Sequence, residues 1–155
     1  MKNPALIPLL LLASFCAGSR GDSMSARPGH GAISIQVVPN PIVATKVSGD
    51  TYEFPLQIVV RETGGRPVEI IKVFAQVFAL GGIRIAEETY DAAKITSLGY
   101  ATRIPANGEV TYRFVQRRSV PDDRLFSGVS ADLTVEARDD TGTPTRATTS
   151  VTVTR

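Results

Sequence analysis

Apolar and polar residues alternate along residues 129–154, and this pattern constrains the fold of the chain more than any other. Successive side chains of a β-strand point to opposite faces of the sheet, so the alternation predicts two strands, each with one face in a core and one in water. The polar sequence Asp139–Pro144 separates them and predicts a turn. The pair is typical of an antiparallel hairpin that closes a β-sandwich.

The same alternation recurs earlier in the chain and predicts strands over residues 33–38, 52–60 and 110–114. Residues 68–80 are apolar on both faces, so we expect this strand to be central in its sheet or to be covered by the following segment. The sequence Pro39–Pro41 follows the first strand. Proline cannot donate to a β-ladder, so we expect an edge strand that breaks there and switches sheets.

Residues 83–98 carry the weakest pattern in the chain. A short strand over 83–85 and one helical turn over 91–95 are the elements that we expect there. In the polar loop before the closing hairpin, Leu125 and Phe126 are the two large apolar residues, and we expect both to pack back onto the core.

The strand count predicts an all-β fold, an immunoglobulin-like or fibronectin type III-like β-sandwich of seven to eight antiparallel strands. A chain of 155 residues suffices for one such domain, which we expect over residues 32–155. Residues 58–68 and 104–112 resemble a hairpin and the start of a later strand in bacterial extracytoplasmic immunoglobulin-like domains. The resemblance implies a fold and an exported location, and it carries over no catalytic residue.

The N-terminus has the pattern of a secretory signal, which we expect to span residues 1–18. Lys2 precedes the apolar run Ala5–Ala13, and small residues follow it. The run is shorter than the roughly 20 residues that a membrane-spanning helix needs. Residues 19–31 are rich in Gly and Ser and predict a flexible tether, which includes His30.

Cys16 is the only cysteine of the chain and ends the predicted signal. Residues 12–16 resemble a bacterial lipobox, in which the cysteine becomes lipidated, although Phe15 stands where Gly, Ala or Ser is usual. The alternative is ordinary cleavage after Gly18. The expected location is therefore the cell envelope, periplasm or outer membrane, with a lipid anchor on Cys16 as the only membrane attachment, or else the secreted fraction.

The composition argues against several chemistries. Nucleophilic catalysis of the Ser-His-Asp or Cys-His kind needs a positioned imidazole, and the only histidine, His30, lies in the predicted tether. A zinc or copper site needs several His, Cys or Met ligands, and the chain has one histidine, one cysteine and two methionines. The 17 basic residues are scattered among 15 acidic ones, which argues against nucleic-acid binding.

Two weak binding signals remain. Adjacent carboxylates such as Asp139 and Asp140 can bind calcium through their oxygen atoms, and calcium is the one cofactor that we consider. The alternative is that the two carboxylates lie in a solvated turn. Tyr90 and Tyr100 flank the least regular segment and are candidates for a sugar-binding surface; the alternative is packing over the edge of the sandwich. A free sheet edge also allows a polypeptide to bind by strand addition.

We therefore expect a non-enzymatic domain with a binding or envelope-structural role. Its expected partner is a protein or glycan of the cell envelope, and the domain is expected to be monomeric. The alternatives are a carbohydrate-binding accessory module and a small enzyme with a carboxylate site.

Overall fold

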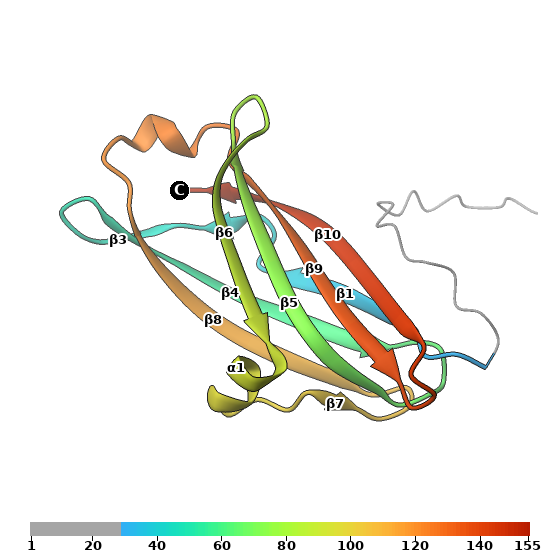
Figure 1. Ribbon diagram of the computed structural model, residues 1–155. Helices are drawn as coiled ribbons and strands as arrows, with labels where there is room; N and C mark the ends of the chain where they lie inside the picture. Colours follow the sequence, from blue (N-terminus) through green and yellow to red (C-terminus); the bar gives the residue numbers. More distant parts are fainter. Residues whose placement is uncertain (1–28) are drawn as a thin grey trace, which may run out of the picture.

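Two β-sheets face each other across an apolar core in the computed structural model, which describes residues 29–155 (Figure 1). In the first sheet β4 is the central strand, with β8 along one side and β1 and β3 along the other. The bounds of these strands are β1 (Ile33–Val38), β3 (Thr45–Ser48), β4 (Thr51–Glu62) and β8 (Glu109–Ser119).

The second sheet has the strand order β2-β10-β9-β5-β6, and the short β7 pairs with β5. Its strands are β2 (Ile42–Val43), β5 (Val68–Ala79), β6 (Ile83–Asp91), β7 (Arg103–Ile104), β9 (Ser130–Asp139) and β10 (Pro144–Thr154). Helix α1 (Ala92–Ser97) follows β6, and the 3-10 helix η1 (Asp123–Phe126) lies between β8 and β9. This architecture confirms the predicted immunoglobulin-like β-sandwich. All pairs are antiparallel except β2 with β10, which is parallel.

The proline-rich break after β1 switches the chain between the sheets, as predicted. Strand β1 pairs with β4 in the first sheet, and β2 pairs with β10 in the second. Pro39 and Pro41 lie in the connection between them. The short strand after the break thereby pairs with the last strand of the domain.

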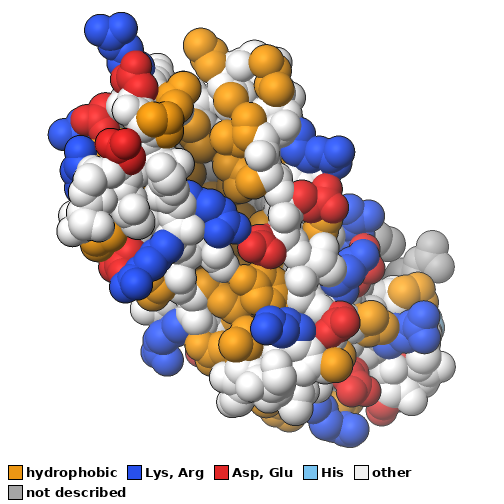
Figure 2. All heavy atoms as spheres, turned by 60° about the vertical axis from the view of Figure 1, so that its left-hand side comes forward, with side chains coloured by type: hydrophobic (Ala, Val, Ile, Leu, Met, Phe, Trp, Pro, Cys, Tyr) orange, Lys and Arg blue, Asp and Glu red, His pale blue; other side chains and the backbone are white. Residues whose placement is uncertain are grey.

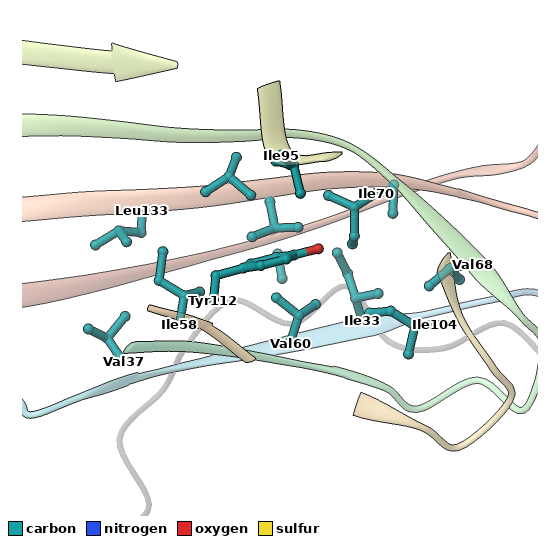
Figure 3. Packing of buried hydrophobic residues seen from close by; sticks show 14 of the residues in the cluster. Ile33, Val37, Ile58, Val60, Val68, Ile70, Ile95, Ile104, Tyr112 and Leu133 are labelled. Atoms are coloured by element: carbon teal, nitrogen blue, oxygen red, sulfur yellow. The ribbon is translucent and has the colours of Figure 1, made fainter. Parts of the chain in front are cut away.

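The core fills the space between the sheets with aliphatic side chains around one tyrosine (Figure 3). Tyr112 on β8 lies fully buried in the middle of this cluster, and Ile58 and Val60 approach it from the neighbouring β4. Figure 3 shows Ile70 and Leu133 on the side of the second sheet. The predicted inward face of the closing hairpin is also buried, from Ala131 to Ala137 on β9 and at Ala147 and Val151 on β10.

Strand β5 lies inside its sheet, as predicted. Strict alternation, however, wrongly predicts which of its side chains face the core. Its register with β9 shifts between Ile70 and Lys72. Ile70 and Val73, which alternation puts on opposite faces, are therefore both buried in the core, whereas Ile71 is 36% exposed. A β-bulge adds one residue to a strand and so reverses the faces beyond it.

Two expectations in the weakly patterned regions are wrong. Strand β6 has nine residues and extends to Asp91, well beyond the short strand expected over 83–85. Leu125 is 55% exposed, although its neighbour Phe126 packs into the core as expected. No helix between residues 29 and 155 has the length and apolar character needed to cross a membrane.

The predicted signal over residues 1–18, with Cys16, lies outside the described residues, as does most of the predicted tether over 19–31. The last residues of that tether lie against the domain. The backbone N–H of Gly31 donates to Oδ2 of Asp139 at 3.0 Å. His30 Nδ1 lies 3.7 Å from the same oxygen. Arg66 also donates to the carbonyl of Gly29, so residues 29–31 all contact the domain.

Candidate functional site

An apolar groove of about 370 Å³ opens between the two sheets. Strands β4 and β8 line one wall, β5, β6 and β9 line the other, and η1 lies at the mouth. The space-filling view shows hydrophobic side chains gathered around a hollow at one end of the molecule (Figure 2). Side chains along its walls include Phe54, Leu56, Phe114, Ala75, Val77 and Ala131.

The groove lies between two separate clusters of buried residues. The large core cluster reaches it at Ile58, Val73 and Leu133. A small cluster of Ala44, Tyr52 and Phe126 closes the other side, with the rings of Tyr52 and Phe126 in edge-to-face contact at 4.9 Å. Small side chains on the second sheet leave the space between the clusters unfilled. This space is therefore a site that an apolar molecule can occupy.

Exposed apolar residues lie at the mouth of the groove and beside it. Ile85 and Leu125, which line the groove, are 58% and 55% exposed, and Leu80 and Ile83 at the β5–β6 hairpin are 71% and 65% exposed. The hairpin approaches the loop after η1, because a Cβ placed on Gly128 would lie 2.8 Å from Leu80 Cδ1. Clustered apolar exposure of this kind marks binding surfaces.

Two polar contacts join β6 to β8 along the flank of the groove. Arg118 pairs with Glu88 at 2.9 Å, and Gln116 Nε2 donates to the hydroxyl of Tyr90 at 2.6 Å. The ring of Tyr90 also packs against Phe114 with centroids 4.9 Å apart. These contacts connect the two sheets, so the open way into the groove is the end with η1 and the β5–β6 hairpin.

The two tyrosines proposed as a sugar-binding surface pack over the edge of the sandwich. Tyr90 lines the groove, as described above. Tyr100 lies edge-to-face on Tyr112, and its hydroxyl donates to the carbonyl of Arg113 at 2.7 Å. The structure does not bring the two rings together as one exposed face, and only Tyr90 belongs to the groove.

The carboxylates proposed for calcium have different partners at the opposite end of the sandwich. Asp139 is buried and accepts hydrogen bonds from the N–H groups of Gly31, Thr141 and Thr143 and from the Thr141 hydroxyl. The Thr141 hydroxyl and these N–H groups hold the pKa of Asp139 well below its usual range. Asp140 instead pairs with Arg66 at 2.8 Å. Within residues 29–155 no three His, Cys, Asp or Glu side chains cluster as metal ligands.

Glu62 is a second buried carboxylate at the same end of the sandwich as Asp139, which we call the polar end. The sequence pattern did not single it out. It accepts hydrogen bonds from the backbone N–H groups of Ala32, Gly64, Gly65 and Asn107. Burial acts to raise its pKa, but these four donors outweigh it, and the pKa is lowered. Glu62 and Asp139 therefore hold loops together.

The sequence analysis missed the groove itself. Its walls come from strand residues that alternation assigns correctly to the core, and alternation carries no information on how far apart two sheets lie. One signal was present: Leu80 and Ile83 flank the Gly81–Gly82 turn, and Leu125 lies in a polar loop, so three large apolar residues stand at turns. Of these, only Leu125 was expected to pack onto the core.

Searches against protein-family models and against curated proteins found no match. Among solved structures, the X-ray structure of the structural-genomics target SoR45 is similar with a TM-score of 0.55 and 13% identity, covering 83% of this chain and 90% of that one. The putative ApaA protein of Bordetella pertussis has a TM-score of 0.52 and 12% identity, covering 83% and 99%. A CARDB domain from Pyrococcus furiosus has a TM-score of 0.38 and 10% identity, covering 88% and 99%, and is too distant to bear on function. At these identities the likeness shows the fold alone.

Proposed function

We propose that this chain is a non-enzymatic binding domain of the cell envelope, and that it takes up an apolar ligand in the groove between its sheets. The observation that carries this proposal is the groove itself, which is apolar on both walls and open at one end. Its volume lies within the range of about 300–1,000 Å³ that is usual for ligand pockets.

The polar residues of the groove support binding over catalysis. Glu88 is paired with Arg118, and the adjacent Glu87 is paired with Arg84 at 3.0 Å. Both side chains line the groove, but each is engaged by a different arginine, so the two carboxylates do not form a converging pair. A pair of carboxylates with separate acid and base roles requires such convergence.

Export and anchoring are part of the same proposal and rest on the sequence. The signal pattern over residues 1–18 and Cys16 support a lipid-anchored domain. His30 and Gly31 lie at the polar end, and the groove opens at the other end. Attachment at the N-terminal side therefore leaves the mouth free. Mass spectrometry of the mature N-terminus tests the anchor, and an unmodified chain that begins at Ser19 would disprove it.

Binding of the fluorescent apolar probe N-phenyl-1-naphthylamine tests the groove. We expect a saturable rise in fluorescence with the native domain and its loss in Ala131→Phe, because Ala131 lines the groove and a phenyl ring there fills it. Ala75→Phe places a phenyl ring in the groove from β5, in the same wall, and serves as an independent variant. Circular dichroism establishes that each variant is folded.

The matched control is Thr152→Leu on β10, an exposed position that does not line the groove. It adds an apolar side chain to the surface and should leave probe binding unchanged. Failure of the native domain to bind the probe, or equal binding by both folded filling variants, would refute the proposal.

A further inference from the structure

We propose that two copies of this chain associate through the mouths of their grooves, about a two-fold axis that passes beside η1. The tip of the β5–β6 hairpin of each copy then lies over the groove of the other. This association is independent of any ligand in the groove, and it differs from the monomer expected from the sequence. Three features of the mouth support it: its shape, its exposed apolar residues and its two unpaired charges.

The tip of the β5–β6 hairpin is an apolar projection. Leu80 and Ile83 stand at either end of the Gly81–Gly82 turn, in which both glycines have a positive φ. A Cβ placed on either glycine would meet nothing within 4 Å, so the turn stands clear of the rest of residues 29–155. Figure 1 shows this hairpin projecting beyond the neighbouring strands. At its base Leu80 lies against the loop at Gly128, which holds the projection in place.

The projection and the apolar hollow stand side by side at one end of the molecule (Figure 2). Ile85 and Leu125 line the hollow and are more than half exposed, as is Ile83 on the projection. A surface that carries both shapes is complementary to its own copy when a two-fold axis relates the two. The tip of one copy then covers the hollow of the other, which removes apolar surface of both from water.

Two exposed charges of opposite sign lie unpaired at η1. The other charged residues of η1 and of the groove wall form ion pairs, namely Arg84–Glu87, Arg118–Glu88 and Arg155–Asp123. Asp122, which is the N-cap of η1, and Arg124 make no ion pair with residues 29–155. Together they favour neither an anionic nor a cationic partner. A second copy of η1 carries the same two charges and is complementary to both.

The spacing of these charges suits an antiparallel pair of η1 helices. A 3-10 helix has about three residues per turn, and Asp122 and Arg124 are two residues apart, so both lie within one turn. A rotation of 180° places Arg124 of the partner subunit beside Asp122 and forms the reverse pair across the axis. Leu125 follows Arg124 and is covered by the same contact. The axis therefore brings the ion pairs and the apolar contact together.

An anionic membrane surface is the competing partner, and the charges do not favour it. Asp122 offsets Arg124, and on the neighbouring β3–β4 turn Asp50 offsets Lys46. This turn belongs to the same end, because the carbonyl of Asp50 accepts from the N–H of Val120 in the groove wall. Attraction to anionic lipids needs an excess of basic residues. A membrane still makes a distinct outcome in the experiment.

Sedimentation velocity of the purified domain over a range of concentrations tests the association. We expect a reversible equilibrium between monomer and dimer. Ile83→Asp should abolish the dimer, because it places a charge on the apolar tip. The matched control is Val115→Asp: Val115 is 61% exposed, against 65% for Ile83, but it does not line the groove. This control should leave the dimer unchanged.

Charge reversal tests the pairing of Asp122 with Arg124. Asp122→Arg and Arg124→Asp should each raise the dissociation constant of the dimer by about tenfold or more, since two opposite-charge pairs become like-charge pairs. An equimolar mixture of the two variants should form a heterodimer, because each copy supplies the charge that the other needs. The double variant Asp122→Arg/Arg124→Asp should form a dimer for the same reason. Circular dichroism establishes that each variant is folded, and no recovery in the mixture would contradict the pairing.

The outcomes separate this interface from the proposed function. A domain that is monomeric at every concentration, or a dimer that Ile83→Asp leaves intact, would overturn the interface, and the groove function would stand. A monomer whose co-sedimentation with anionic phospholipid vesicles is lost in Ile83→Asp would identify a membrane surface as the partner instead. Asp122 and Arg124 do not line the groove, so both charge variants should still bind N-phenyl-1-naphthylamine. If the monomer does not bind the probe while the dimer forms, the groove function falls and the interface stands.

Discussion

Glu62 ties together three segments that are far apart in the sequence. Its carboxylate accepts from Ala32 before β1, from Gly64 and Gly65 in the turn after β4, and from Asn107 before β8. The approach is close, because a Cβ on Gly64 would lie 2.2 Å from the carbonyl oxygen of His30. One side chain thus organises the polar end, where orphaned N–H groups would otherwise be buried.

The variant Glu62→Gln should destabilise the domain by about 2 kcal/mol at pH 7, because an amide replaces one accepting oxygen with a donor facing backbone N–H groups. The pKa of Glu62 is lowered in the folded state, so its contribution is present above pH of about 4 and is lost as the pH falls below that value. Thermal unfolding at pH 7 and pH 3 should show that the variant loses less stability on acidification than the native domain. The exposed Glu69→Gln at the same end is the control, and an equal effect there would contradict the role of Glu62.

Calcium should not stabilise the domain through Asp139 and Asp140. Oδ1 of Asp139 already accepts from the N–H groups of Thr141 and Thr143 and from the Thr141 hydroxyl, and Oδ2 accepts from the N–H of Gly31. Asp140 is turned to Arg66. We expect no heat in calorimetric titration with calcium and no rise in melting temperature. A rise that Asp139→Asn abolishes would restore the calcium site.

At the scale of the element, Tyr112 and Tyr100 attach the segment between α1 and β7 to strand β8. The Tyr112 hydroxyl donates to the carbonyl of Ala101 at 2.9 Å. The Tyr100 hydroxyl both donates to the carbonyl and accepts from the N–H of Arg113. This segment has few strand bonds of its own, so the two tyrosines position it over the core.

Tyr112→Phe should cost about 1 kcal/mol at pH 7, since it removes one hydrogen bond and leaves the Ala101 carbonyl without that donor. Burial raises the pKa of Tyr112 to about 12, against about 10 in an unfolded chain. Its contribution is therefore complete below pH 10 and is lost as the pH rises from 10 to 12. Chemical denaturation at pH 8 and pH 11 should show a smaller alkaline loss in the variant. Equal losses would show that Tyr112 does not govern alkaline unfolding.

The elements differ in how well the sequence predicts them. Alternation predicted the closing hairpin, and the two prolines predicted the switch from β1 to β2, because both signals act within a few residues. Strand β6 was underestimated because it lies at a sheet edge, where both faces are partly solvated and alternation weakens. The shift at Ile70 depends on pairing with β9, which no local pattern contains. The groove depends on the separation of two sheets and was likewise not predictable.

At the scale of the molecule, the two ends of the sandwich are built differently. The polar end is held by Glu62 and Asp139, whose carboxylates take most of the loop N–H groups there. The mouth end is held by the small cluster around Phe126 and by the contacts of Tyr52, Arg155 and Asp123. Fewer buried contacts make local opening easier at the mouth, which suits the admission of a ligand.

Hydrogen exchange followed by mass spectrometry should resolve this asymmetry. We expect the amides of η1 and of residues 83–88 to exchange faster than those of β4 and β9, which pair on both sides over most of their length. Saturating N-phenyl-1-naphthylamine should slow exchange at the mouth and leave the turn after β4 unchanged. Uniform exchange along the chain, or slowing confined to the polar end, would contradict this division.

The pairing of β2 with β10 also determines how the domain responds to force. The chain enters at the polar end through β1, crosses to β2, and runs parallel to β10, which ends beside the mouth. Tension applied between the two ends pulls β1 along β4 and β2 along β10, so their hydrogen bonds are loaded together in shear and do not unzip one after another. We expect the domain to resist extension better than a hairpin that opens from its ends.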